Sequence, residues 1–175
     1  MSQILHTERL MLRPCTLADL DAVHELWTDP DIRQFLFDDR TLSRQEASDF
    51  LAASNESFVQ QGYGLWLFFE RSGDASGGQS STIAGFSGLM SVPDQSPSVV
   101  FGTRPPLWGR GYAKEATAAI LHYVFYDLGL DQVVADVDEP NTASIHVLEG
   151  LGMVPTGRAV VDDRPLLYYA SQPSR

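Results

Sequence analysis

Apolar and polar residues follow two different periodicities along the chain, and together these indicate a mixed α/β protein. Strands are predicted where β-branched, aromatic or alternating apolar residues form short runs bounded by turn residues. The first run ends at Pro14, and because proline is tolerated at a sheet edge, this run is predicted to be an edge strand. The predicted strands are Arg9–Pro14, Leu65–Glu70, Ile83–Met90, Val99–Thr103, Gln132–Asp138, Arg158–Val161 and Leu166–Ala170.

Four stretches repeat apolar residues at helical spacing. Thr16 and Ser43 are predicted N-caps, because each is followed three residues later by an acidic residue that completes a capping box. Gly62, Gly129 and Gly152 stand where the last three helices are expected to end. The predicted helices span residues 17–27, Ser43–Gln61, 116–128 and Thr142–Leu151.

Composition limits the classes of protein that fit. The chain has 175 residues, of which 43% are hydrophobic, so a single domain over residues 1–175 with a sizeable core is expected. A formal net charge of -11 argues against binding by phosphate neutralisation, so no nucleic-acid partner is expected. Cys15 is the single cysteine and the four histidines show no ligand spacing, so neither a disulfide nor a metal site is expected.

Neither export nor membrane insertion is expected from the sequence. Glu8 and Arg9 interrupt the segment that would have to be the apolar part of a signal peptide. The longest strongly apolar run, Leu65–Phe69, is far shorter than the roughly 20 residues needed to span a bilayer. A cytoplasmic protein without a membrane partner is therefore expected.

A glycine-rich turn, Trp108–Lys114, lies where a strand is followed by a helix. Gly109 and Gly111 have no Cβ, so an anion can approach the main chain, and the first N–H groups of the helix attract negative charge. The segment from Arg104 to Lys114 holds three cations and no acid. The alternative is a turn fitted for close strand–helix packing. A dinucleotide fingerprint fits less well, because it requires a third small residue where Lys114 stands.

A second segment, Asn141–Ser144, opens the last predicted helix. On their own, Asn141 is most simply a helix N-cap and Ser144 an ordinary first-turn residue. The combination of the two segments is more specific. The succession of WGRGYAKEA, an amphipathic helix, the strand VVADV and NTASIHVLEGLGM resembles the acyl-CoA-binding half of the GNAT N-acetyltransferase superfamily. The opening TERLMLRP resembles the branch that contains the ribosomal-protein N-terminal acetyltransferases.

This resemblance covers nearly the whole chain and implies a fold, a cosubstrate and a set of site residues. The implied fold is a central twisted, mostly antiparallel sheet of about seven strands flanked by about four helices. The implied cosubstrate is acetyl-CoA, with its pyrophosphate on the glycine-rich turn and its pantetheine arm along one strand and the asparagine. The residues implied in binding it are Phe101, Gly102, Thr103, Gly109, Arg110, Gly111, Tyr112, Ala113, Lys114, Asn141 and Ser144.

The resemblance also implies that Ser144 helps to protonate the departing thiolate, but the usual acid and base are missing. Pro97–Val99 offers no glutamate as general base, and Leu148 stands where some relatives have a tyrosine acid. Asp94 or Asp136, acting through water, is a candidate weak base. The alternative for both is an ordinary solvated surface carboxylate.

Acidic pairs are consistent with a cationic acceptor. Asp38 with Asp39, and Asp162 with Asp163, lie in two loops that flank the acceptor entrance in the family, although solvated turn acids are the simpler interpretation. Trp27, Phe35 and Phe37 line that entrance, pack in the core or form a dimer contact. The expected function is acetyl transfer to a primary amine, either a small molecule or a protein N-terminus, by a monomer or homodimer. The alternative is a catalytically silent acyl-CoA-binding sensor or docking module of the same fold.

Overall fold

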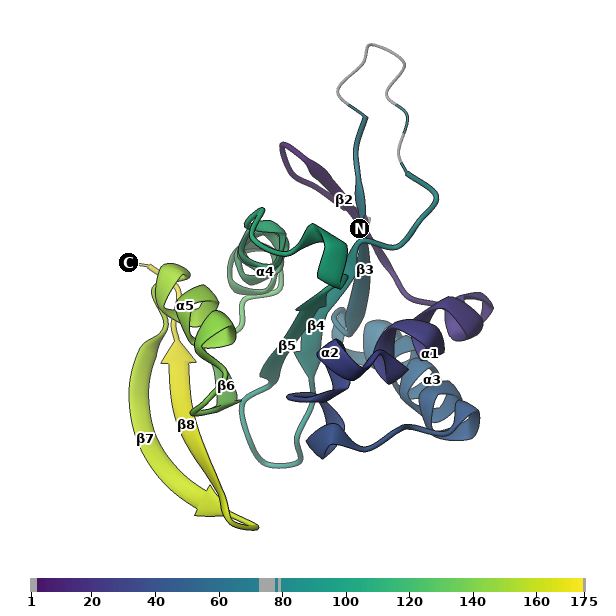
Figure 1. The fold of residues 1–175 in the computed structure, drawn as a ribbon. Coiled ribbons are helices and arrows are strands. Elements are labelled where there is room, and N and C mark those ends of the chain that lie inside the picture. The colour runs from purple at the N-terminus through teal and green to yellow at the C-terminus, as the bar shows by residue number, and fades with distance from the viewer. Residues whose placement is uncertain (1–2, 73–77, 79, 175) are drawn as a thin grey trace.

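The structure is a computed structural model that describes residues 3–72, 78 and 80–174. These residues form one eight-stranded sheet in the order β1-β2-β3-β4-β5-β6-β8-β7 (Figure 1). Neighbouring strands are antiparallel except for β5 and β6, which are parallel. The strands are β1 Leu5–His6, β2 Leu10–Pro14, β3 Leu65–Glu70, β4 Gly85–Met90, β5 Ser98–Thr103, β6 Val133–Asp138, β7 Val154–Val161 and β8 Arg164–Ser171.

Helices cover both faces of the sheet, with α1 and α3 on one face and α4 and α5 on the other (Figure 1). The predicted capping box of α3 is confirmed: Ser43 Oγ accepts from the Glu46 N–H at 3.1 Å, and Glu46 Oε2 accepts from the Ser43 N–H at 2.8 Å. Gly62 closes the same helix with φ +83°. The α-helices are α1 Leu20–Thr28, α2 Pro30–Arg33, α3 Arg44–Gln61, α4 Tyr112–His122 and α5 Thr142–Gly150; shorter helical turns span Leu17–Asp19, Phe37–Asp39, Pro105–Leu107 and Tyr123–Asp127.

The mixed α/β architecture and mostly antiparallel sheet are confirmed, and three details of the prediction are corrected. The sheet has eight strands among the described residues rather than about seven, because the two-residue β1 was not predicted. The strand ending at Pro14 is not at the edge: β2 lies between β1 and β3. Proline is tolerated because β1 pairs only with Met11 and Leu12, so Pro14 lies beyond it. The third predicted helix ends in a π turn, Tyr123–Asp127.

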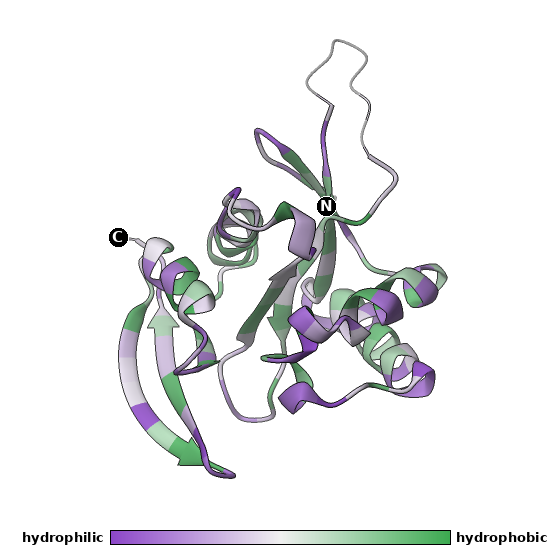
Figure 2. Cartoon of the chain, viewed as in Figure 1, coloured by the Kyte–Doolittle hydropathy of each residue, from purple (hydrophilic) through white to green (hydrophobic). Residues whose placement is uncertain are grey.

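Strand β3 divides the core into two layers. Trp66 and Phe68 belong to a buried cluster with residues of α4 and α5 and with Phe58 of α3, whereas Leu65, Leu67 and Phe69 belong to a second cluster with residues of α1 and α3. Both faces of the strand are therefore buried, which explains its uninterrupted apolar sequence. Hydrophobic residues accordingly concentrate along the central strands, and hydrophilic ones on the outer sides of the helices and turns (Figure 2).

The β5–β6 pair is the irregular part of the sheet. Among the described residues, its single residue pair joins Ser98 to Val134, and the Val134 N–H donates to the Pro97 carbonyl at 3.0 Å. Beyond this point β5 continues to Thr103 without β6 beside it, so the main chain on that side of β5 faces open space. Within the described part of the chain, no helix is long and apolar enough to cross a membrane.

Candidate functional site

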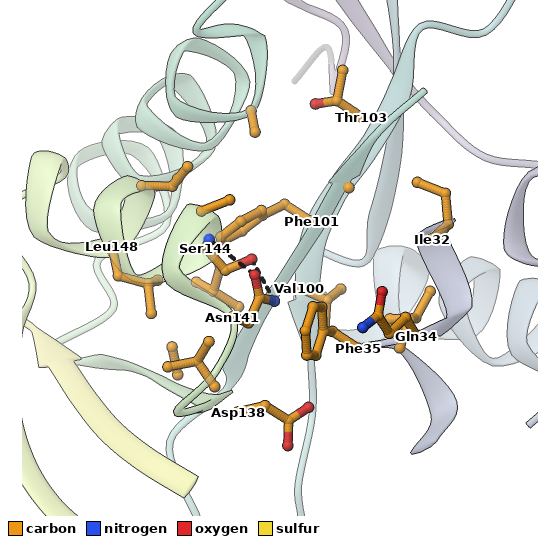
Figure 3. Close-up of a pocket in the computed structure, with 18 of the residues that line it drawn as sticks. Ile32, Gln34, Phe35, Val100, Phe101, Thr103, Asp138, Asn141, Ser144 and Leu148 are labelled. Carbon is orange, nitrogen blue, oxygen red and sulfur yellow. Dashed lines mark hydrogen bonds between the residues drawn. The ribbon is translucent and has the colours of Figure 1, made fainter. Parts of the chain in front are cut away.

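A cleft of ≈ 1030 Å³ opens where β5 and β6 diverge. Its volume is in the range of small-molecule binding sites, about 300–1000 Å³ or slightly above. The residues that form it come from β5, β6, the starts of α4 and α5, α2 with the turn after it, and the β7–β8 turn. Figure 3 shows Ile32, Gln34 and Phe35 on one side of β5, with Asn141, Ser144 and Leu148 on the other.

The start of α4 presents uncapped main-chain amides to this cleft. Gly109 and Gly111 have φ values of +80° and +79°, a conformation that side-chain-bearing residues rarely adopt. The first hydrogen bond of the helix runs from the Glu115 N–H to the Gly111 carbonyl. The main-chain N–H groups of the helical residues before Glu115 therefore have no carbonyl partner within the helix. Gly111 is the N-cap and supplies no side chain. This geometry suits an anion.

Most of the residues implied for the phosphate site line the cleft: Gly109, Gly111, Tyr112, Ala113 and Lys114. The Arg110 side chain does not; it is 52% exposed and its Nη1 lies 3.7 Å from Glu70 Oε2.

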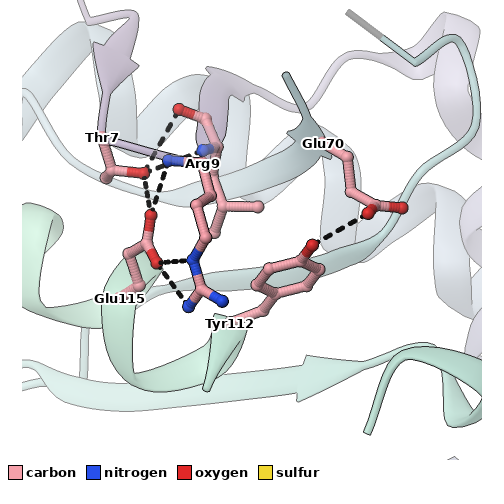
Figure 4. Close-up of polar contacts among 6 residues, drawn as sticks. Thr7, Arg9, Glu70, Tyr112 and Glu115 are labelled. Atoms are coloured by element: carbon pink, nitrogen blue, oxygen red, sulfur yellow. Dashed lines mark hydrogen bonds and ion pairs between the residues drawn. The ribbon is translucent and has the colours of Figure 1, made fainter. Parts of the chain in front are cut away.

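A polar network that the sequence does not indicate holds the first turn of α4 in place (Figure 4). Glu115 accepts from Thr7 Oγ1 at 2.6 Å and from the Arg9 N–H and Nε at 2.9 and 2.7 Å. Burial raises the pKa of Glu115, but these hydrogen bonds outweigh it and leave the pKa below its usual range. The Arg9 guanidinium lies 4.8 Å from the centre of the Tyr112 ring, and Tyr112 donates to Glu70 at 2.8 Å. Partners more than 100 positions apart leave no local sequence signal.

Asn141 and Ser144 form a small hydrogen-bonded unit at the start of α5 (Figure 3). Asn141 Oδ1 accepts from the Ser144 N–H at 3.2 Å, and Asn141 Nδ2 donates to Ser144 Oγ at 3.0 Å. Asn141 is therefore the N-cap that the simpler interpretation predicted, and both residues also line the cleft. On the facing strand, Phe101, Gly102 and Thr103 line it as well.

The predicted acids divide into those in the cleft and those outside it. Asp38, Asp136 and Asp162 line the cleft. Asp94 lies in the exposed turn between β4 and β5, and Asp39 and Asp163 sit in exposed turns with positive φ; these three lie outside the cleft lining.

Asp138, at the end of β6, lines the cleft and was not predicted as a site residue. It is 8% exposed and accepts a hydrogen bond from Arg164, which also pairs with Asp38. Burial, and then the charge of Asp136, raise the pKa of Asp138. A second acid two residues after Asp136 on the same strand is the signal that was available in the sequence.

The wall opposite α5 is apolar. Phe35 and Phe37 belong to it, whereas Trp27 is 2% exposed and packs edge-on against Phe37, Phe50 and Phe86 in the core. Of these three aromatic residues, Phe35 and Phe37 thus line the cleft, and Trp27 packs in the core. The described apolar residues of this wall are Ile32, Phe35, Leu36, Phe37, Phe50, Phe86, Met90 and Val100.

Both a protein-family model and individual proteins are similar in sequence to this chain. A family model described as an acetyltransferase (GNAT) domain matches residues 9–154. The uncharacterized N-acetyltransferase p20 of Bacillus licheniformis is 25% identical over 157 residues, covering 89% of this chain and 84% of the relative.

Two solved structures have closely similar folds. A GNAT-family acetyltransferase from Bordetella pertussis superposes with a TM-score of 0.79 at 22% identity, covering 95% of this chain and 98% of the other. The ribosomal L7/L12 α-N-protein acetyltransferase RimL, solved with coenzyme A, gives a TM-score of 0.79 at 16% identity and 97% coverage of both chains. At these identities the likeness concerns the fold.

Proposed function

Because the chain belongs to the GNAT acetyltransferase family, we propose that it is an N-acetyltransferase that moves an acetyl group from acetyl-CoA to a primary amine. The observation that carries the proposal is the cleft at the β5–β6 divergence, which has bare helix amides at one end and carboxylates at the other. An anionic donor and a cationic acceptor would meet between these two ends.

The donor end fits coenzyme A. A Cβ on Gly109 would meet no described atom within 4 Å, so the main chain there is open to a ligand. The α4 amides and Lys114 would hold the pyrophosphate, and RimL, which has this fold, was solved with coenzyme A. When bound, acetyl-CoA supplies an activated thioester. The β5 main chain from Val100 to Thr103 would align its arm as an added strand would.

The acceptor end fits a cation, and a small energy difference favours α-amines. Attack requires the neutral amine. An α-amine with a pKa of about 7.7–8.0 is disfavoured at pH 7 by roughly 1 kcal/mol, whereas a lysine amine near 10.4 is disfavoured by roughly 4.6 kcal/mol. A site without the glutamate of many relatives therefore suits an α-amine, on a small molecule or a protein N-terminus. Ser144 or water would protonate the departing sulfur.

A second candidate function is an acyl-CoA-binding module without catalysis. Two sequence departures favour it: Pro97–Val99 has no glutamate, and Leu148, which replaces the tyrosine of some relatives, is 1% exposed and has no acidic proton.

Calorimetry with acetyl-CoA, followed by a thiol-release assay with a panel of amines from pH 7 to 9, separates the two functions. Binding with release for at least one amine supports the transferase. Binding without release for any amine supports the module, and absence of binding contradicts both.

A further inference from the structure

We propose that Asp138 is the residue that binds the ammonium group of the acceptor and takes its proton, with Arg164 as the residue that positions it. This inference rests on the proposed transferase function and assigns the base that the sequence comparison leaves open. It concerns a residue two positions from Asp136, which is one of the two candidate weak bases that the sequence offers.

Burial distinguishes Asp138 from the other acids of the site. Asp138 is 8% exposed and lines the cleft, whereas Asp136 is exposed. A carboxylate with little water around it interacts more strongly with a nearby ammonium than a solvated one does, because screening is weaker. Asp138 lines the same cleft as Phe35, Asn141 and Ser144, and Figure 3 shows its carboxylate below Asn141.

The charges around Asp138 favour a cation. Five carboxylates line the described cleft, and of its two cationic side chains Lys114 belongs to the donor end on α4. Among the described residues that line the cleft, Arg164 is therefore the one cation at the acceptor end. An amine that enters as an ammonium ion reduces this excess of negative charge. The five acids are Asp31, Asp38, Asp136, Asp138 and Asp162.

Arg164 is placed to hold Asp138 without blocking it. Its guanidinium pairs with Asp138 on β6 and also with Asp38 in the turn after α2. A guanidinium has donors for more than one carboxylate, so Arg164 keeps an ion pair with Asp38 when an ammonium ion approaches Asp138. The same contacts join the two walls of the acceptor end.

The chemical step is a proton transfer followed by acyl transfer. One N–H bond of the ammonium breaks and its proton passes to the Asp138 carboxylate, which leaves a lone pair on nitrogen. That lone pair forms the C–N bond at the thioester carbonyl, the C–S bond breaks, and the thiolate takes a proton from Ser144 or water. The second nitrogen proton leaves to solvent. The proton held by Asp138 passes through water to replace the one that Ser144 or water gave to the thiolate, so both groups are restored and one amide, one thiol and one proton are produced.

Burial and the neighbouring Asp136 raise the pKa of Asp138. Its pKa is therefore closer to that of the amine, and Asp138 is a better proton acceptor than a solvated aspartate. The hydrogen bond from Arg164 favours the ionised form of the carboxylate. The described charged groups from the elements around Asp138 are Asp136 on β6, Arg164 on β8, Asp38 after α2, Asp162 in the β7–β8 turn, and the Glu139–Arg158 pair beside it.

The test compares kcat/KM of wild type, Asp138→Asn, Asp138→Glu and Asp136→Asn between pH 7 and 9 with a peptide α-amine. Asparagine cannot accept the proton, so Asp138→Asn uses only amine that is already neutral, about one molecule in ten at pH 7 for a pKa near 8. We expect a loss of about tenfold or more at pH 7 that shrinks toward wild type at pH 9, with partial rescue by Asp138→Glu. With an alkylamine of pKa near 10.4, the loss should remain large up to pH 9, because its recovery is expected about two pH units higher than that of the α-amine.

A purely structural role of Asp138 would give a loss that does not depend on pH or on the amine. Such a result, or no loss at all, overturns the inference, as does the same pH-dependent loss in Asp136→Asn instead. Asp131→Asn, in the exposed bend before β6, is the matched control and should behave as wild type. Calorimetric binding of acetyl-CoA to Asp138→Asn should equal that of wild type, which verifies the fold. If wild type itself acetylates no amine, the proposed function fails, and that outcome is distinct from failure of Asp138 alone.

Discussion

Replacing Gly109 by alanine isolates the contribution of the bare amide turn to cosubstrate binding. Gly109 has φ +80° and lines the cleft, and Gly129 has φ +77° beyond the end of α4 and outside the cleft lining. A Cβ at either position would meet no described atom within 4 Å. Alanine in this left-handed region costs roughly 1–2 kcal/mol, so both variants should lose that amount of stability.

The two variants should differ in binding acetyl-CoA. The new methyl group of Gly109→Ala lies beside amides that would bind phosphate, and loss of one hydrogen bond to a charged group costs about 1.5–3 kcal/mol. This corresponds to a dissociation constant raised about ten- to hundredfold, whereas Gly129→Ala should bind as wild type.

Urea denaturation measures the first effect and isothermal titration calorimetry the second. Equal affinity of the two variants for acetyl-CoA, at equal loss of stability, would refute the assignment of the turn as a phosphate site.

Three further outcomes are expected. Ser144→Ala should largely keep acetyl-CoA binding by calorimetry, because it loses the hydrogen bond from Asn141 Nδ2 but keeps the main-chain N–H that Asn141 Oδ1 caps. Thiol release should fall severalfold, because the hydroxyl that would protonate the sulfur is gone; unchanged release would remove Ser144 from the mechanism. The pKa of Glu115 is lowered in the fold, so the stability that its carboxylate contributes is present above the ordinary carboxyl pKa of 4.5 and is lost as the pH falls through the folded pKa. Urea denaturation should therefore show that Glu115→Gln loses less stability on acidification than wild type does. An equal loss would contradict this. Burial raises the pKa of the Cys15 thiol to about 11, so iodoacetamide at pH 8 should label it only after unfolding, as mass spectrometry would show; rapid labelling of the native protein would contradict its burial.

Local features of the fold were predictable because they depend on neighbours in sequence. The capping box at Ser43, the bounds Leu65–Glu70 and the glycine-rich turn all follow from residues within one or two turns of each other. The two-residue β1 and four-residue α2 were not, since elements this short leave no periodicity.

Contacts between distant segments account for what the sequence does not indicate at the site. Arg164 contacts Asp138, 26 residues away, and Asp38 in a different region of the chain. Whether an aspartate is buried depends on such packing, so the sequence offered only Asp136 and Asp94, both exposed in the structure, as candidate weak bases. The resemblance to a family singled out the two motif-bearing segments, at Trp108–Lys114 and Asn141–Ser144, and residues of both line the cleft.

The lone residue pair between β5 and β6 leaves the sheet as two panels that meet at one point, Ser98 with Val134. Helix α4 contacts β2, β4 and β5 on one panel and reaches α5 beside the other, so it supplies much of the remaining connection. An extended molecule bound along β5 would add contacts between the two panels of the sheet. Tight binding and a stiffer sheet would then arise from the same hydrogen bonds, and heating without ligand would first loosen the end of the molecule formed by β6, β7 and β8.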